Sequence, residues 1–228
     1  MAAYCIPRIP GTLYIIPTKN ILTDKPQMLM IRRLEKHMEW DEVYKQNYES
    51  KAFWNIHWLN SAQCLLASAK ELEPKIAELW ENYRAHSKDK NVRLKADHFQ
   101  GPYFMLVAFA LENLFKAVLV SERSWQYKQE FREKCQFPKD LKGHDLVALA
   151  RKANYGFGLE EEDFLRRLTR HAVWEGRYPV PILYKKSAVA EEFSDGKEHH
   201  VSWFGGNDLE RLKELVSKVS LYAGVKDA

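Results

Sequence analysis

Three arginines near the end of one helical segment could together hold a phosphate group. Arg166, Arg170 and Arg177 fall roughly in line on one face if the helix extends that far. Guanidinium groups bind phosphate oxygens in bidentate pairs, and Tyr178 adds a hydroxyl directly after Arg177. A second interpretation is structural: Arg177 bonds the last helical carbonyls, the Tyr178 ring packs on the protein, and Pro179 prevents continuation of the helix. The sequence leaves both interpretations open.

His171 lies in the same segment and could exchange a proton with a ligand. Arg166 precedes it by five residues and Arg167 by four. Five residues turn through a net angle of about 140° around an α-helix, so only Arg167 would share a face with His171. Arg166 and His171 would converge only across a break in the helix or between two subunits. Alternatively, His171 is a hydrogen-bonded histidine at the edge of the core, and Arg166 pairs with Glu162.

The remaining candidates are a lysine in an apolar segment, two adjacent histidines and three tryptophans. Lys116 lies one turn after Glu112, and is either its ion-pair partner or a cation available to a ligand. His199 and His200 would point to opposite faces of a hairpin, so we predict no metal site, and we predict no cofactor. Three tryptophans follow an apolar stripe and are interpreted as core rather than as base-stacking platforms: Trp54, Trp58 and Trp80.

The composition is that of a soluble globular protein with a small excess of positive charge. Of 228 residues, 46% are hydrophobic and 29% are charged, and the net charge of +4 permits an anionic partner without requiring one. The three cysteines are far apart and lack C-x-x-C spacing, which predicts no disulfide framework and favours a reducing cytoplasm. Polar residues interrupt the longest apolar run, 103–120, and the N-terminus does not resemble a signal peptide, so we predict no membrane association.

Five segments after residue 49 have helical periodicity. The first runs from about residue 50 to residue 83, and we expect Pro74 to kink it rather than to end it. The second, 101–120, is apolar nearly all round, which is typical of the central helix of a bundle. A cap at His144 or Asp145 starts the third. The last three lie within 143–158, 159–176 and 207–222. These segments predict an all-α, up-and-down bundle of about five helices.

Two regions fall outside this helical pattern. Residues 1–49 are expected to form an N-terminal extension that packs on the bundle, with a helix from Pro26. Residues 183–206 are expected to form a hairpin-like excursion before the last helix, because Asp195 and Gly196 separate two short runs with strand character. Residues 50–228, including this excursion, are predicted to be one domain.

The order of these motifs resembles the HEPN domain family. The chain has a long first helix, then ALENLFKAVLV, then GHDLVALA, then an acid-led helix that ends in GRYP, over residues 50–222. The resemblance implies a helical bundle that pairs as a homodimer and binds a nucleotide or RNA. For some members it also implies a nucleotidyltransferase-type partner protein.

The resemblance also bears on catalysis. Some HEPN proteins are metal-independent ribonucleases, including toxin–antitoxin and defence proteins, in which four to six residues separate an arginine from a histidine, whereas others are binding or accessory modules. Arg166 and His171 match this spacing as a catalytic pair. Two further pairs have the same spacing: Arg32 with His37, and Arg93 with His98. The predicted ligand-binding residues are Arg170, Arg177, Tyr178 and Lys116. We predict a nucleotide- or RNA-binding module, with a ribonuclease and a structural protein-interaction module as alternatives.

Overall fold

The computed structural model describes most of the chain after residue 39. The described residues are 40–86, 88, 99–178, 181, 190–193, 196–200, 204 and 208–225. The chain divides into two compact units, Met1–Asn47 and Tyr48–Ala228. The boundary falls inside helix α2 (Trp40–Ala52), so the first unit contributes only the start of that helix to the described residues. The expected helix from Pro26 and the expected packing of the extension lie outside them.

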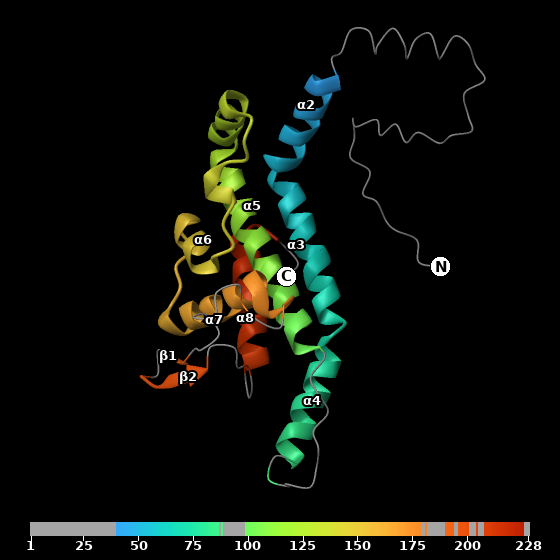
Figure 1. Cartoon of the computed structure of the whole chain (residues 1–228), viewed down its shortest axis with the longest axis vertical. Coiled ribbons are helices and arrows are strands. Elements are labelled where there is room, and N and C mark those ends of the chain that lie inside the picture. The colour runs from blue at the N-terminus through green and yellow to red at the C-terminus, as the bar shows by residue number, and fades with distance from the viewer. Residues whose placement is uncertain are drawn as a thin grey trace, which may run out of the picture. The chain divides into compact units, whose positions relative to one another are not determined.

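The described part of the second unit is an all-α helical bundle, as the sequence predicts (Figure 1). Its helices after α2 are α3 (Asn55–Lys70), α4 (Glu73–His86), α5 (Gln100–Lys134), α6 (Leu146–Lys152), α7 (Leu159–Arg170) and α8 (Asp208–Tyr222). Two shorter turns complete it, the 3-10 turn η1 (Lys139–Leu141) and the π-helical turn η2 (His171–Glu175).

Helix α5 forms the centre of this bundle. It packs along α3 and also contacts α6, α7, α8 and η2. Phe104, Leu111 and Phe115 are fully buried in it, and each such burial contributes about 2 kcal/mol to folding. Among the described helices, α5 alone is long and apolar enough to cross a membrane, but most of its apolar stretch is buried inside the protein. That burial is typical of a helix in a protein core.

The first predicted helix is interrupted twice. Phe53 and Trp54 separate α2 from α3, and Glu71 and Leu72 separate α3 from α4. The prediction that Pro74 only kinks the helix was therefore wrong. A proline has no backbone N–H for the carbonyl four residues earlier, and its ring clashes with that carbonyl, so α3 ends and α4 begins one residue before Pro74.

Helix α5 extends well beyond its predicted end at residue 120. It kinks at Arg123, whose backbone is non-helical (φ −125°, ψ 19°), and then continues to Lys134. In this second half only Tyr127 and Phe131 are buried. Two aromatic side chains one turn apart in a polar stretch are a weak signal, which explains why the periodicity did not reveal this part of the helix.

Helices α6 and α7 begin at the predicted places. Asp145, rather than His144, caps α6, and its Oδ1 accepts a hydrogen bond from the backbone nitrogen of Ala148 at 3.0 Å. The backbone nitrogen of Leu146 donates to Thr169 Oγ1 at 3.0 Å and joins the start of α6 to α7. Acidic residues fill the first turn of α7, where the helix dipole favours them.

A short antiparallel hairpin precedes α8, as predicted for residues 183–206. Strand β1 (Ala190–Glu192) pairs with β2 (Glu198–His200), and Ala190 lies opposite His200. Gly196, in the connection, has a φ of 72°, a left-handed conformation that a glycine adopts without strain. Apart from Phe193, Lys197 and Phe204, the rest of this excursion lies outside the described residues, as does Asn207.

Candidate functional site

The helix that carries the predicted site residues ends in a π-helical turn. In η2 the backbone nitrogen of Gly176 donates to the carbonyl of His171, five residues earlier, at 3.2 Å. Gly176 packs closely against α5, because a Cβ at this position would lie 2.5 Å from the Cβ of Met105. Glycine is therefore required where the end of this helix meets the core. Single π turns inside helices are frequent at functional sites.

Arg166 is held by carboxylates on two elements. Its Nη2 donates to Asp163 Oδ1 at 2.5 Å, and its Nη1 donates to Glu191 Oε2 of β1 at 3.2 Å. The expected pairing of Arg166 with Glu162 is therefore replaced by these two contacts, and Glu162 instead pairs with Arg151 at 3.0 Å. The Arg166 guanidinium already has anionic partners on two sides.

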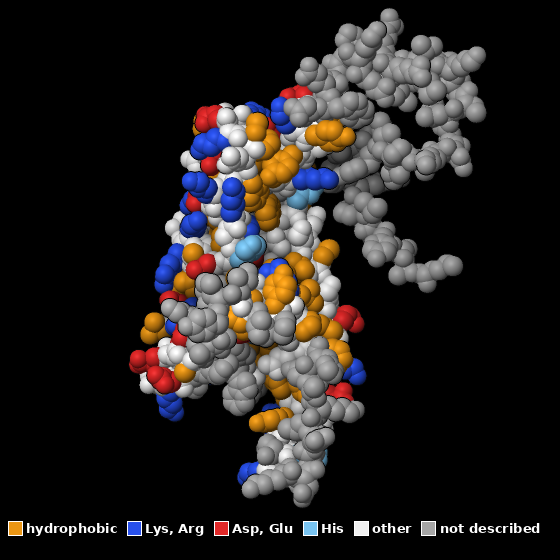
Figure 2. Space-filling view, viewed as in Figure 1, with side chains coloured by type: hydrophobic (Ala, Val, Ile, Leu, Met, Phe, Trp, Pro, Cys, Tyr) orange, Lys and Arg blue, Asp and Glu red, His pale blue; other side chains and the backbone are white. Residues whose placement is uncertain are grey.

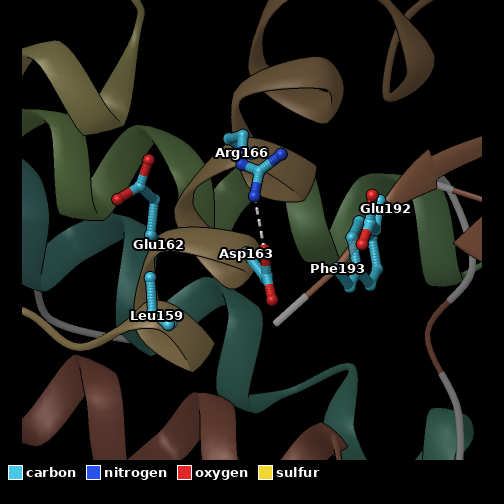
Figure 3. A pocket seen from close by; sticks show the side chains of 6 residues that line it. All are labelled: Leu159, Glu162, Asp163, Arg166, Glu192 and Phe193. Carbon is cyan, nitrogen blue, oxygen red and sulfur yellow. Dashed lines mark hydrogen bonds and ion pairs between the residues drawn. The ribbon is translucent and has the colours of Figure 1, made fainter. Parts of the chain in front are cut away.

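A pocket of about 250 Å³ opens beside Arg166. Figure 3 shows Asp163 facing the guanidinium, while Glu192 and Phe193 approach from the hairpin. The lining residues are Leu159, Glu162, Asp163, Arg166, Glu192 and Phe193. Three carboxylates against one guanidinium make this pocket acidic, so it repels a phosphate group.

His171 is buried between aromatic rings. Its side chain is 6% exposed, and its ring centroid lies 5.4 Å from that of Phe104 and 5.5 Å from that of Phe204. Burial lowers the pKa of His171 from 6.5 to about 4, although the nearby Glu175 carboxylate opposes this shift. Its Nε2 lies 3.5 Å from Glu175 Oε2, and neither ring nitrogen forms a hydrogen bond with another described residue. His171 is therefore neutral at pH 7 and shielded from solvent.

The structure does not bring Arg166 and His171 together through a shared contact. Within the described part of the chain, Arg166 pairs with Asp163 and Glu191, whereas His171 meets Glu175 and two phenylalanine rings. The other two Arg–His pairs with the same spacing lie outside the described residues. A catalytic role for Arg166 and His171 stays a prediction for which this geometry offers no support.

Arg167 is the arginine that shares a face with His171. Its guanidinium carbon lies 4.4 Å from the ring centroid of Phe204, the same ring that contacts His171. Its Nη1 donates to Asp208 Oδ2 at 3.1 Å, and its side chain is buried. Arg167 therefore joins α7 to the start of α8 inside the protein.

The other two arginines of the expected phosphate patch are also engaged internally. Arg170 donates from Nε and Nη2 to Glu175 Oε1 at 3.1 and 3.0 Å. Arg177 Nη2 donates to the carbonyl oxygens of Ala172 and Val173, both at 2.8 Å. Arg177 thus caps the helix end, as the structural interpretation expects. Tyr178, by contrast, is 53% exposed rather than packed on the bundle.

Lys116 forms the ion pair that its spacing allows. Its Nζ lies 2.6 Å from Glu112 Oε1, and both side chains are buried in α5. The other oxygen of this carboxylate, Oε2, lies 2.9 Å from His144 Nδ1. His144 comes from the loop before α6 and its side chain is 55% exposed. The sequence did not indicate this contact, because the two residues are 32 positions apart.

A long stretch with net positive charge lies on the second half of α5, η1 and α6. Residues 123–152 contain eight lysines and arginines against four acidic residues, an excess equal to the net charge of the whole chain. We call the cations of this segment the basic face: Arg123, Lys128, Arg132, Lys134, Lys139, Lys142, Arg151 and Lys152. Arg132, Lys134 and Arg151 pair with Glu49, Glu130 and Glu162. Figure 2 shows blue side chains gathered along the upper left edge, over these elements.

The parts of the basic face are tied together by one carboxylate. Asp140 Oδ2 lies 3.6 Å from Nη1 of Arg123 in α5, and Asp140 Oδ1 lies 3.1 Å from Nζ of Lys152 in α6. Lys139 and Lys142 flank Asp140 in and after η1, are exposed, and form no ion pair with any described residue. These two lysines are the cations of the face that are most available to a ligand.

Two exposed tryptophans lie near the basic face. Trp125 is 72% exposed on α5, and Trp54 is 47% exposed just before α3. Ser124 Oγ donates a hydrogen bond to the carbonyl oxygen of Phe53 at 2.7 Å. Trp125 directly follows Ser124 and Trp54 directly follows Phe53, so this bond joins the two segments that carry the tryptophans. The interpretation of Trp54 as core was wrong, whereas Trp58 and Trp80 do pack against the core.

No protein-family model, curated protein sequence or solved structure matches this chain. The HEPN resemblance therefore stays a prediction.

Proposed function

We propose that this protein is a binding module for single-stranded RNA and that RNA lies on the basic face. The observation that carries the proposal is the excess of positive charge at residues 123–152. Phosphate contacts from lysine and arginine supply most of the affinity of proteins for nucleic acids without regard to sequence. The expected phosphate patch on α7 and η2 is a weaker candidate, because Arg166, Arg170 and Arg177 are all bonded internally, whereas the exposed Lys139 and Lys142 of the basic face form no ion pair with a described residue.

The extent of the basic face favours RNA over a single nucleotide. From Arg123 to Lys134 the helix alone rises about 17 Å, and the cations of η1 and α6 add to this length. A mononucleotide has one phosphate cluster and reaches few of these side chains at once. A polynucleotide carries one phosphate per nucleotide and can therefore reach several of these side chains at once.

The exposed tryptophans favour unpaired bases. Stacking of a base on an aromatic side chain contributes about 1–3 kcal/mol and requires bases that are not paired with a second strand. Trp125 and Trp54 offer such rings beside the cations of α5.

We propose that the protein binds RNA without cleaving it because His171 is buried. A general base must reach the proton that it removes. The His171 ring is buried against Phe104 and Phe204, and Arg166 is bound by two carboxylates.

The proposal is tested by removing the two exposed lysines of the basic face that have no described ion-pair partner. Each phosphate contact to a single strand contributes about 0.7 to the slope of log affinity against log salt, or about fivefold in affinity at 0.1 M salt. The double substitution Lys139→Gln, Lys142→Gln should therefore weaken RNA binding about 25-fold. The measurement is fluorescence anisotropy of a labelled 12-nucleotide RNA in EDTA.

The matched control removes the same charge elsewhere. Lys70 and Lys75 are exposed on α3 and α4, away from the basic face, so Lys70→Gln, Lys75→Gln should bind almost as the wild type does. Equal losses in the two double variants would show that only net charge matters and would remove the basic face as the site. RNA shortened by the wild type in EDTA would instead support the ribonuclease alternative.

A further inference from the structure

A buried ion pair in the centre of the bundle is connected to the surface by one histidine. Lys116 Nζ lies 2.6 Å from Glu112 Oε1, and His144 Nδ1 lies 2.9 Å from Glu112 Oε2. The lysine and the glutamate are buried, whereas the side chain of His144 is 55% exposed. The three groups form a chain from the core of α5 to the loop before α6.

Stability does not explain why this pair lies in the core. Burying a lysine and a glutamate costs several kcal/mol of desolvation, and apolar residues of similar volume are often equally or more stable. The neighbours of the pair on α5, such as Leu111 and Phe115, are fully buried apolar side chains. What the pair provides is a carboxylate fixed in one orientation, with one oxygen taken by Lys116 and the other directed to His144.

This carboxylate determines which nitrogen of His144 carries the proton. A carboxylate only accepts hydrogen bonds, so His144 Nδ1 must be the donor. In the neutral ring Nε2 then has a lone pair and is an acceptor. Among the described residues, no three His, Cys, Asp or Glu side chains gather as metal ligands. The Nε2 atom is therefore suited to a hydrogen-bond donor from a ligand.

The surroundings of His144 restrict that donor. His144 follows Lys142 by two residues and so lies within the basic face, which attracts anions and repels cationic donors such as ammonium groups. Phosphate oxygens are acceptors and cannot donate to Nε2. The required group is a neutral donor carried by an anionic chain. A ribose 2′-hydroxyl fits, because every RNA nucleotide has one and DNA has none.

We propose that His144 Nε2 accepts a hydrogen bond from a ribose 2′-hydroxyl of bound RNA. Glu112 is the positioning residue, and Lys116 holds its carboxylate in place. This inference rests on the proposed function, and it adds that the basic face distinguishes RNA from DNA. A base amino group could also donate to Nε2, but it would not distinguish the two sugars.

The test compares three labelled 12-mers of one base sequence: RNA, the 2′-O-methyl RNA and the DNA with uracil in place of thymine. One hydrogen bond corresponds to about fivefold in affinity, so the wild type should bind RNA about fivefold more tightly than either analogue. His144→Ala should bind all three alike, at the affinity of the wild type for the 2′-O-methyl strand. Its exposed side chain makes loss of folding on substitution unexpected, and a melting curve checks this.

A second variant tests the positioning role of the carboxylate. Glu112→Gln should reduce the preference for RNA over 2′-O-methyl RNA, because an amide no longer fixes His144 Nδ1 as the donor. If this variant does not fold, His144→Ala alone decides the question. An RNA preference that survives in His144→Ala, or equal binding of all three strands by the wild type, would overturn the inference and leave the proposed function standing. A wild type that binds no strand would overturn both.

Discussion

The buried imidazole of His171 should make the folded state lose stability as the pH falls below neutrality. Burial lowers the pKa of His171 from 6.5 to about 4 in the folded protein. Because the folded pKa lies below the unfolded one, the unfolded chain takes up the proton first. The contribution of the neutral His171 ring to the free energy of unfolding is therefore complete above pH 6.5, and it is lost as the pH falls toward 4. At pH 5 the shift corresponds to about 2 kcal/mol of the free energy of unfolding.

Urea unfolding at pH 7.5 and at pH 5.0, followed by far-UV circular dichroism, measures this contribution. The wild type should lose about 2 kcal/mol more than His171→Gln between the two pH values, because glutamine does not titrate. The control His86→Gln replaces an exposed histidine on α4 and should lose as much as the wild type. Equal losses in the wild type and His171→Gln would refute the burial of this ring.

Gly176→Ala should destabilise the fold by about 1–3 kcal/mol in urea unfolding, because its Cβ would lie 2.5 Å from Met105 Cβ, and Met105→Ala should recover part of the loss. No change would mean that η2 does not pack tightly on α5. Glu112→Leu should cost about 3–5 kcal/mol because it leaves the Lys116 cation buried alone, whereas adding Lys116→Met should restore near wild-type stability. A double variant as unstable as the single one would contradict this account. Trp125→Ala should weaken RNA binding about tenfold at an unchanged melting temperature; unchanged binding would remove the stacking role.

Helical periodicity predicted the class of the fold and its central helix, because α5 is apolar nearly all round over residues 101–120. It did not predict where helices break. A stripe that keeps its phase across Pro74 appears the same in the sequence whether the backbone bends or stops. The second half of α5 was missed because only Tyr127 and Phe131 are buried there.

Contacts within one or two helical turns could be predicted, whereas contacts between distant segments could not. The Glu112–Lys116 pair and the Arg177 cap follow from local spacing. The partner Glu191 that holds Arg166 comes from a hairpin 25 residues later, and periodicity gives no information about such pairing. The same holds for the contact of His144 with Glu112, although both residues belong to motifs that the sequence singles out.

The measurement that tests the central claim most directly is the affinity of the wild type for a labelled single-stranded 12-mer RNA across a series of salt concentrations in EDTA. If several cations of the basic face contact phosphates, log affinity should fall with log salt at a slope of about −0.7 per contact, or about −2 for three. RNA that stays intact, with binding weakened about 25-fold in Lys139→Gln, Lys142→Gln, is the predicted result. Two results would contradict the account: no binding at about 50 mM salt, or an affinity that does not change with salt.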